Sequence, residues 1–191
     1  MCSSDLLLRP GSDPSADGDM PLVQPTTAGR RGALPVLLQA RHAQEEATLL
    51  AERLLAAHAT GTPLDEMAVL CRTKQQMRPI ERALRDAGLV FQSMNAQAFR
   101  HFDWQRPSVK LLTFHSAKGL EFALVCVAGL HMLPLREETL EDAVRLLYVA
   151  MTRATRELLL SAHGQGVVVD RVRDALATVA QQFAAAPVTG A

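Results

Sequence analysis

Apolar runs of strand length alternate with amphipathic stretches along most of the chain. The apolar runs lie at residues 35–40, 67–71, 89–94, 109–114, 124–128 and 157–161. Between them, apolar residues recur three to four positions apart, which predicts helices at 43–59, 76–86, 140–153 and 168–183. Strands that alternate with helices indicate βαβ units. We therefore expect an α/β fold, with a mainly parallel sheet and helices on both of its faces.

The first 32 residues have a different composition from the rest, with Pro and Gly spread among Ser, Asp and Thr. Such a segment buries little surface, so we expect a flexible tail, disordered or non-native, at 1–32. One domain is expected at 33–166, followed by a C-terminal helix and tail at 167–191. Hydrophobic residues are 48% of the chain and aromatic residues only 4%, which predicts an aliphatic core.

Charge and cysteine content exclude several classes of protein. The 20 Lys and Arg balance the 20 Asp and Glu, so a nucleic-acid contact must come from a local cluster and not from a basic surface. Three widely spaced cysteines give neither a disulfide framework nor a CxxC zinc site, and Cys71 and Cys126 are expected in the core. No apolar run reaches the ~18 residues of a membrane span. We expect a soluble, cytoplasmic protein.

Two segments carry candidate chemistry, and the first is VKLLTFHSAKGLEF at 109–122. A buried strand leads into hydrogen-bonding residues, a cation, a flexible Gly119 and a carboxylate, Glu121, held between two apolar neighbours. Ligands of parallel sheets bind at the carboxyl ends of strands, so we expect Phe114–Glu121 there, together with Arg72, which follows another strand. The alternative is an ordinary strand-to-helix turn, because turns favour the same residue types.

The second segment is VRLLYVAMTRATR at 144–156, an apolar helix with Arg153 and Arg156 near its end. Taken alone, it is better explained by a core helix whose arginines complement the helix dipole.

Together, the two segments resemble the two late motifs of the UvrD/Rep/PcrA-like superfamily 1 helicases, in the family's order and at about its separation. The stretch MAVLCRTKQQMRPIERALRDAG at 67–88 also resembles the family's strand and helix that precede them. The resemblance covers about residues 35–163. It implies the second RecA-like domain of an ATP-dependent DNA helicase motor, which closes over the nucleotide bound by a first RecA-like domain while single-stranded DNA runs across both.

The resemblance also implies roles for individual residues. Arg153 matches the arginine that reaches the γ-phosphate, the one expected catalytic residue, and Glu121 matches the acidic residue that binds the ribose. Gly119, beside it, is expected to let the backbone approach the nucleotide. On the DNA side, Thr113 and His115 match contact residues, and Arg72 is a weaker candidate for a phosphate contact.

Some features of the family are not found in the 191 residues. The chain has no G-x-x-x-x-G-K-[ST] phosphate loop, so ATP and Mg²⁺ are expected to be held mainly by a first RecA-like domain that this chain does not contain. The family's QNYRS-like string is also missing. Only ~15 residues, 97–111, stand where many relatives insert a large domain, which predicts the short branch of the family. The alternatives are a stand-alone nucleic-acid or nucleotide binding module and an inactive remnant.

The remaining polar and aromatic residues are expected to have structural roles. Phe99, Arg100, His101, Phe102, Trp104 and Arg106 could stack on single strands, but a hydrophobic plug at the sheet edge is favoured. Four histidines, His42, His58, His131 and His163, are scattered and predict no metal site. In the helix at 43–59, Leu50, Leu54 and Ala57 are expected to face inward, with Glu45, Glu46, Glu52 and Arg53 elsewhere. The acidic group of Glu137, Glu138, Glu141 and Asp142 is expected to cap the following helix.

Overall fold

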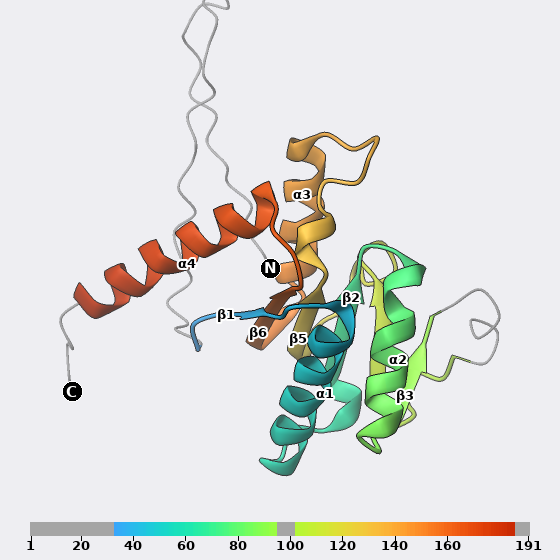
Figure 1. Ribbon diagram of the computed structural model, residues 1–191. Helices are drawn as coiled ribbons and strands as arrows, with labels where there is room; N and C mark the ends of the chain where they lie inside the picture. Colours follow the sequence, from blue (N-terminus) through green and yellow to red (C-terminus); the bar gives the residue numbers. More distant parts are fainter. Residues whose placement is uncertain (1–32, 95–101, 186–191) are drawn as a thin grey trace, which may run out of the picture. The chain divides into compact units, whose positions relative to one another are not determined.

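A computed structural model describes residues 33–94 and 102–185 of the chain (Figure 1). Six strands form one sheet in the order β1-β6-β5-β2-β4-β3, and every neighbouring pair is parallel. The strands are β1 (Val36–Gln39), β2 (Met67–Cys71), β3 (Phe91–Ser93), β4 (Val109–Thr113), β5 (Phe122–Ala128) and β6 (Ala154–Ala162). The predicted parallel α/β fold is confirmed.

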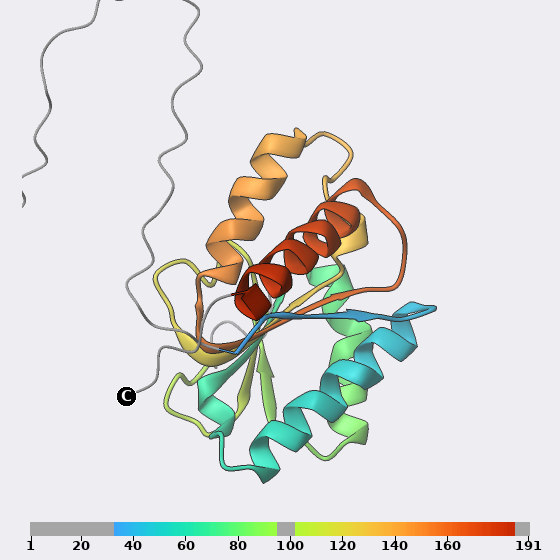
Figure 2. The same cartoon turned by 90° about the vertical axis from the view of Figure 1, so that its left-hand side faces the viewer.

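Helices cover both faces of the sheet (Figure 2). Helices α1 (Ala43–Ala59) and α2 (Met77–Asp86) pack on one face, and α3 (Leu140–Met151) and α4 (Val167–Ala185) pack on the other. Alternate residues of each strand enter the two hydrophobic clusters. In β2, Val69 lies in the cluster under α1 and α2, whereas Leu70 lies in the cluster under α3 and α4. Within the described residues, no helix has both the length and the apolar character needed to cross a bilayer.

The core is aliphatic, as the low aromatic content predicts. Cys71 and Cys126 are fully buried on neighbouring strands, β2 and β5. Burial raises the pKa of both thiols, so they stay protonated and serve as small apolar side chains.

The turn between α3 and β6 is shorter than predicted, and it determines the position of Arg153. The helix expected at 140–153 ends at Met151, and β6 begins at Ala154. Thr152 and Arg153 therefore form the connection between them. Arg153 lies where the chain enters the sheet, at its amino edge.

The connection between β4 and β5, Phe114–Glu121, contains turns and no helix, in contrast to the strand-to-helix alternative. These parallel strands lie on either side of β2, so the connection must return from the carboxyl edge to the amino edge of the sheet. Phe114 and Ala117 are buried in the cluster under α3 and α4. Gly119 has a φ of 82°, a left-handed conformation that glycine adopts at little cost.

The segment before β4 is anchored by Lys110, a strand residue with 1% of its surface exposed. Its Nζ donates to the carbonyls of Asp103 and Arg106 and to Ser108 Oγ, at 2.9 to 3.1 Å. Phe102 packs against the core, consistent with the plug expected here, while Trp104 keeps 44% exposure. Phe99, Arg100 and His101 lie outside the described residues.

Candidate functional site

Arg153 brings the two segments singled out from the sequence into contact. Its Nη1 donates to the carbonyl of Leu120 at 3.2 Å, and its own carbonyl accepts the N–H of Phe122 at 2.9 Å. Its Nε donates to the carbonyl of Val149 at 3.0 Å, and its Nη2 to Thr152 Oγ1 at 3.2 Å. The guanidinium is thus held beside the backbone that leads into β5, with part of its surface open to solvent.

Gly119 and Glu121 flank Leu120, whose carbonyl the guanidinium contacts, and both are exposed. Phe122, directly after Glu121, is 93% buried, and Leu120, directly before it, packs partly against the core. The apolar neighbours fix the backbone while the carboxylate stays in solvent, as the alternation of residue types predicts. A cation, a carboxylate and a glycine turn therefore share one small surface.

This surface lies at the amino edge of the sheet, not at the carboxyl edge where we expected Gly119 and Glu121. The expectation was wrong for these two residues because it took 114–121 to be a turn at the end of one strand. The segment instead spans the sheet and ends at the start of β5. A five-residue strand is about 17 Å long, so the two ends of the segment lie about that far apart, at opposite edges of the sheet.

Thr113 and His115 do lie at the carboxyl edge. Thr113 ends β4, and its Oγ1 accepts the N–H of Ser116 at 3.1 Å and lies 2.8 Å from the Ser116 hydroxyl. The following N–H, of Phe114, donates to the carbonyl of Cys71 on β2 at 3.0 Å. His115 is exposed. The edge thus offers a hydroxyl and an imidazole on a backbone fixed to the neighbouring strand.

Arg72 follows β2 at the same edge but is already paired. Its Nη2 donates to Glu138 Oε1 at 3.1 Å, and the two side chains are only 17% and 11% exposed. Glu138 also accepts the N–H of Leu135 at 3.1 Å, so its role extends beyond the helix capping expected. The helix is capped by Thr139, whose side chain accepts the N–H of Asp142. A phosphate contact by Arg72 would have to share or break the ion pair, and that role stays a prediction.

The structure also gathers residues that the sequence left apart. Glu46 in α1 is 5% exposed, contrary to its expected place among the outward residues. It is hydrogen-bonded to His163, which follows β6, and His163 in turn contacts His131, which follows β5. Neighbouring strands bring these residues together from positions more than 30 apart in the chain. Nothing in the sequence distinguished Glu46, because acidic residues are common in the first turn of a helix.

Comparisons with known proteins identify the families and structures that this chain resembles. The family described as the UvrD-like helicase C-terminal domain matches residues 91–165, from β3 to just beyond β6. The chain is 30% identical over 123 residues to the ATP-dependent DNA helicase PcrA of Bacillus subtilis, covering 59% of the chain and 17% of that protein. It is 31% identical over 159 residues to the ATP-dependent DNA helicase UvrD1 of Mycobacterium leprae, covering 76% of the chain and 20% of that protein.

The fold has a counterpart among solved structures. The C-terminal domain of a possible DNA helicase from Lactobacillus plantarum superposes with a TM-score of 0.60, at 24% identity, over 78% of this chain and 86% of that one. That likeness confirms the fold. The chain spans about a fifth of the length of the curated relatives it matches.

The six-stranded parallel sheet with helices on both faces is a RecA-like α/β fold. The resemblance found in the sequence is confirmed: residues 91–165 match the UvrD-like helicase C-terminal domain, and the relatives include PcrA, Rep and UvrD helicases.

Proposed function

We propose that this chain is the second RecA-like domain of an ATP-dependent DNA helicase motor. Its amino edge completes the ATP site, and its carboxyl edge contacts single-stranded DNA. The contact between Arg153 and the Leu120 carbonyl carries the proposal, because it joins the two motif segments into one surface. Closure of this surface over a nucleotide held by a first RecA-like domain would couple hydrolysis to movement along DNA.

The residues at the amino edge suit a nucleotide. A guanidinium at Arg153 complements phosphate charge through its planar fork of donors, and a carboxylate at Glu121 can accept both ribose hydroxyls. A Cβ added at Gly119 would meet no atom within 4 Å, so the exposed backbone there is open to a ligand. We assign Mg²⁺ and most contacts to the β- and γ-phosphates to the first domain, because no phosphate loop occurs in these 191 residues.

At the carboxyl edge, Thr113 and His115 would meet the DNA backbone. The hydroxyl and the imidazole are donors that suit phosphate oxygens. Arg72 would join them only by sharing its pairing with Glu138. The cytoplasmic location follows from this function and stays a prediction.

We expect the isolated chain to hydrolyse ATP at the background rate. It supplies one arginine and one carboxylate, whereas phosphoryl transfer depends mostly on the phosphate cradle and the metal. The same residues joined to a first RecA-like domain with a phosphate loop should hydrolyse ATP when single-stranded DNA is added. Steady-state ATPase assays of both proteins test the proposal. DNA-stimulated hydrolysis by the isolated chain, or an inactive joined protein, would contradict it; the second outcome favours a stand-alone module or a remnant.

Binding of single-stranded DNA by the isolated chain is expected to be weak, because the net charge is +0 and few donors face the DNA. A hydroxyl displaces no counterion, so the slope of log K against log salt concentration should be shallow, no steeper than about −1.4, the value for two cationic phosphate contacts. Fluorescence anisotropy at several salt concentrations measures the slope. The Thr113→Ala and His115→Ala changes should weaken binding, while His58→Ala, at an exposed position on α1, should not. Tight binding with a steep slope, unchanged by both edge variants, would refute this DNA surface.

A further inference from the structure

Glu46, His131 and His163 form a cluster at the carboxyl edge that the proposed motor function does not use. They come from α1, from the short helix η4 (Leu130–Met132) and from the end of β6. One nitrogen or oxygen from each lies within 4.8 Å of the other two. The edge carrying Arg153 is on the opposite side of the sheet, so this cluster is separate from the candidate ATP site.

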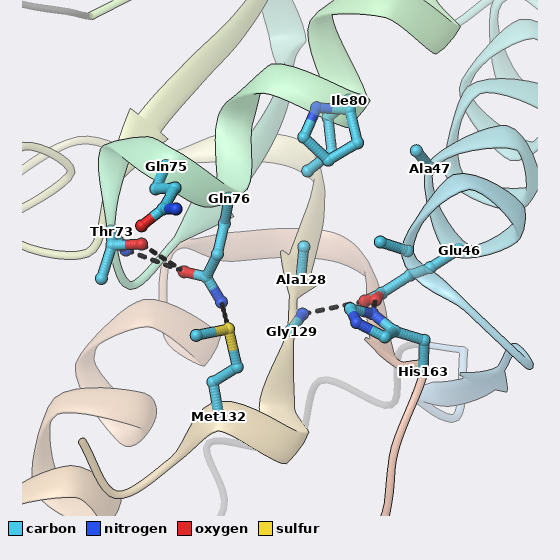
Figure 3. A pocket seen from close by; sticks show the side chains of 12 residues that line it. Glu46, Ala47, Thr73, Gln75, Gln76, Ile80, Ala128, Gly129, Met132 and His163 are labelled. Carbon is cyan, nitrogen blue, oxygen red and sulfur yellow. Dashed lines mark hydrogen bonds and ion pairs between the residues drawn. The ribbon is translucent and has the colours of Figure 1, made fainter. Parts of the chain in front are cut away.

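The carboxylate of Glu46 is fixed in place by the surrounding chain (Figure 3). Its Oε1 accepts the N–H of Gly129 at 2.9 Å and the hydroxyl of Ser161 at 2.5 Å. Its Oε2 is hydrogen-bonded to Nδ1 of His163. These hydrogen bonds hold the carboxylate beside the His163 ring.

The two imidazoles are held against each other. Their ring centroids are 3.9 Å apart, and Nδ1 of His131 accepts the N–H of His163 at 3.3 Å. A Cβ at Gly164 would come within 3.1 Å of the His131 ring, so the loop after β6 packs closely against this ring. Within the described part of the chain, Nε2 of neither histidine has a hydrogen-bond partner.

From this geometry we propose that Glu46, His131 and His163 bind one divalent transition-metal ion of the zinc class. Two imidazoles and one carboxylate suit Zn²⁺ and Co²⁺, whereas Mg²⁺ prefers a shell of oxygens. Tetrahedral ligands around zinc lie ~3.3 Å apart, so donors that lie up to 4.8 Å apart must close by at most about 1.5 Å. Rotation of the His163 side chain, 28% exposed, would bring a ring nitrogen toward the ion in exchange for the hydrogen bond to Glu46.

A cavity of about 270 Å³ lies beside the cluster and gives the ion a route in from solvent. Glu46 and His163 line its wall, together with Gln76, Gly129 and Met132 (Figure 3). A water molecule in this cavity would complete the fourth position around the ion. The bound ion would tie α1, η4 and the end of β6 together at one point.

Titration of the metal-free, untagged chain with Co²⁺ tests the site. We expect the visible absorption of a tetrahedral cobalt ion, saturating at one ion per chain, displaced by Zn²⁺ and not by Mg²⁺. The Tm should rise by about 5 °C when the ion is at a hundred times its Kd. His131→Gln and His163→Gln should each weaken binding at least ten-fold, with folding checked by circular dichroism. The control His58→Gln should bind as the unchanged chain does.

Three results would overturn the proposal. One is the absence of one-to-one cobalt binding by the folded chain. Another is equal binding by the double variant His131→Gln/His163→Gln. The third is a thiolate-to-cobalt charge-transfer band, which would place the ion on a cysteine. None of these outcomes bears on Arg153 or on ATP hydrolysis, so the experiment tests the metal site independently of the proposed motor function.

Discussion

Replacing Arg153 by Ala in a complete helicase that contains this domain is expected to lower kcat for ATP hydrolysis by ~10³-fold or more, the scale of other arginine fingers. Charge shifts onto the bridging and γ-phosphoryl oxygens during transfer, and a guanidinium placed there stabilises the transition state most. Arg153→Lys should fail nearly as badly, because an ammonium lacks the planar fork of donors. Steady-state ATPase kinetics at saturating single-stranded DNA measure the effect.

Arg156→Ala is the matched control, because Arg156 is exposed on β6 three residues further on. It should leave kcat unchanged. Glu121→Ala should instead raise KM for ATP with kcat closer to the original value, since the ribose changes little along the reaction. Glu121→Gln keeps an acceptor and should have a smaller effect. If Glu121→Ala lost kcat as severely as Arg153→Ala at unchanged KM, the ribose assignment would be wrong.

The second large effect concerns stability. Glu138→Ala should lower the free energy of unfolding by about 3 kcal/mol, because it leaves the mostly buried guanidinium of Arg72 without its partner. That is a large share of the 5–15 kcal/mol typical of a domain. The Nε of Arg72 is already buried without a hydrogen-bond partner in the described part of the chain, so few groups are available to compensate. Urea unfolding of the isolated chain measures the change.

Glu137→Ala is the control for this experiment. Glu137 is the exposed neighbour of Glu138, and its loss should change stability by no more than about 0.5 kcal/mol. The double variant Arg72→Met/Glu138→Ala should be more stable than Glu138→Ala alone, because it removes the unpaired charge as well. Equal midpoints for Glu137→Ala and Glu138→Ala would show that the ion pair adds nothing to stability.

The sheet and its helices could be predicted from the sequence because the strands are short apolar runs, two of which, β2 and β5, are buried throughout. The residues on either side of Val69 and of Cys126 are also apolar and buried, which is the pattern of a strand covered on both faces. The helix at 43–59 was predicted to the residue, since a polar residue before it and Gly61 after it limit it.

What the sequence could not give was the edge on which a residue lies. Gly119 and Glu121 follow a strand in the chain, but their position depends on the path of the next connection, and residue types alone do not encode that path. Contacts between distant residues were likewise out of reach. Glu46 looked like a solvent-facing residue because its partners, such as His163, follow strands that become its neighbours only in the sheet order.

The connection Phe114–Glu121 depends on the number of residues between β4 and β5 as well as on their identity. Phe114 is hydrogen-bonded to Cys71 at one edge, and Phe122 to Arg153 at the other, so both ends of the segment are fixed. Eight residues reach at most about 27 Å, and about 17 Å of that is needed to pass along the strands. Deleting or inserting one residue would therefore move Gly119 and Glu121 relative to Arg153, even if every side chain named in the site were kept.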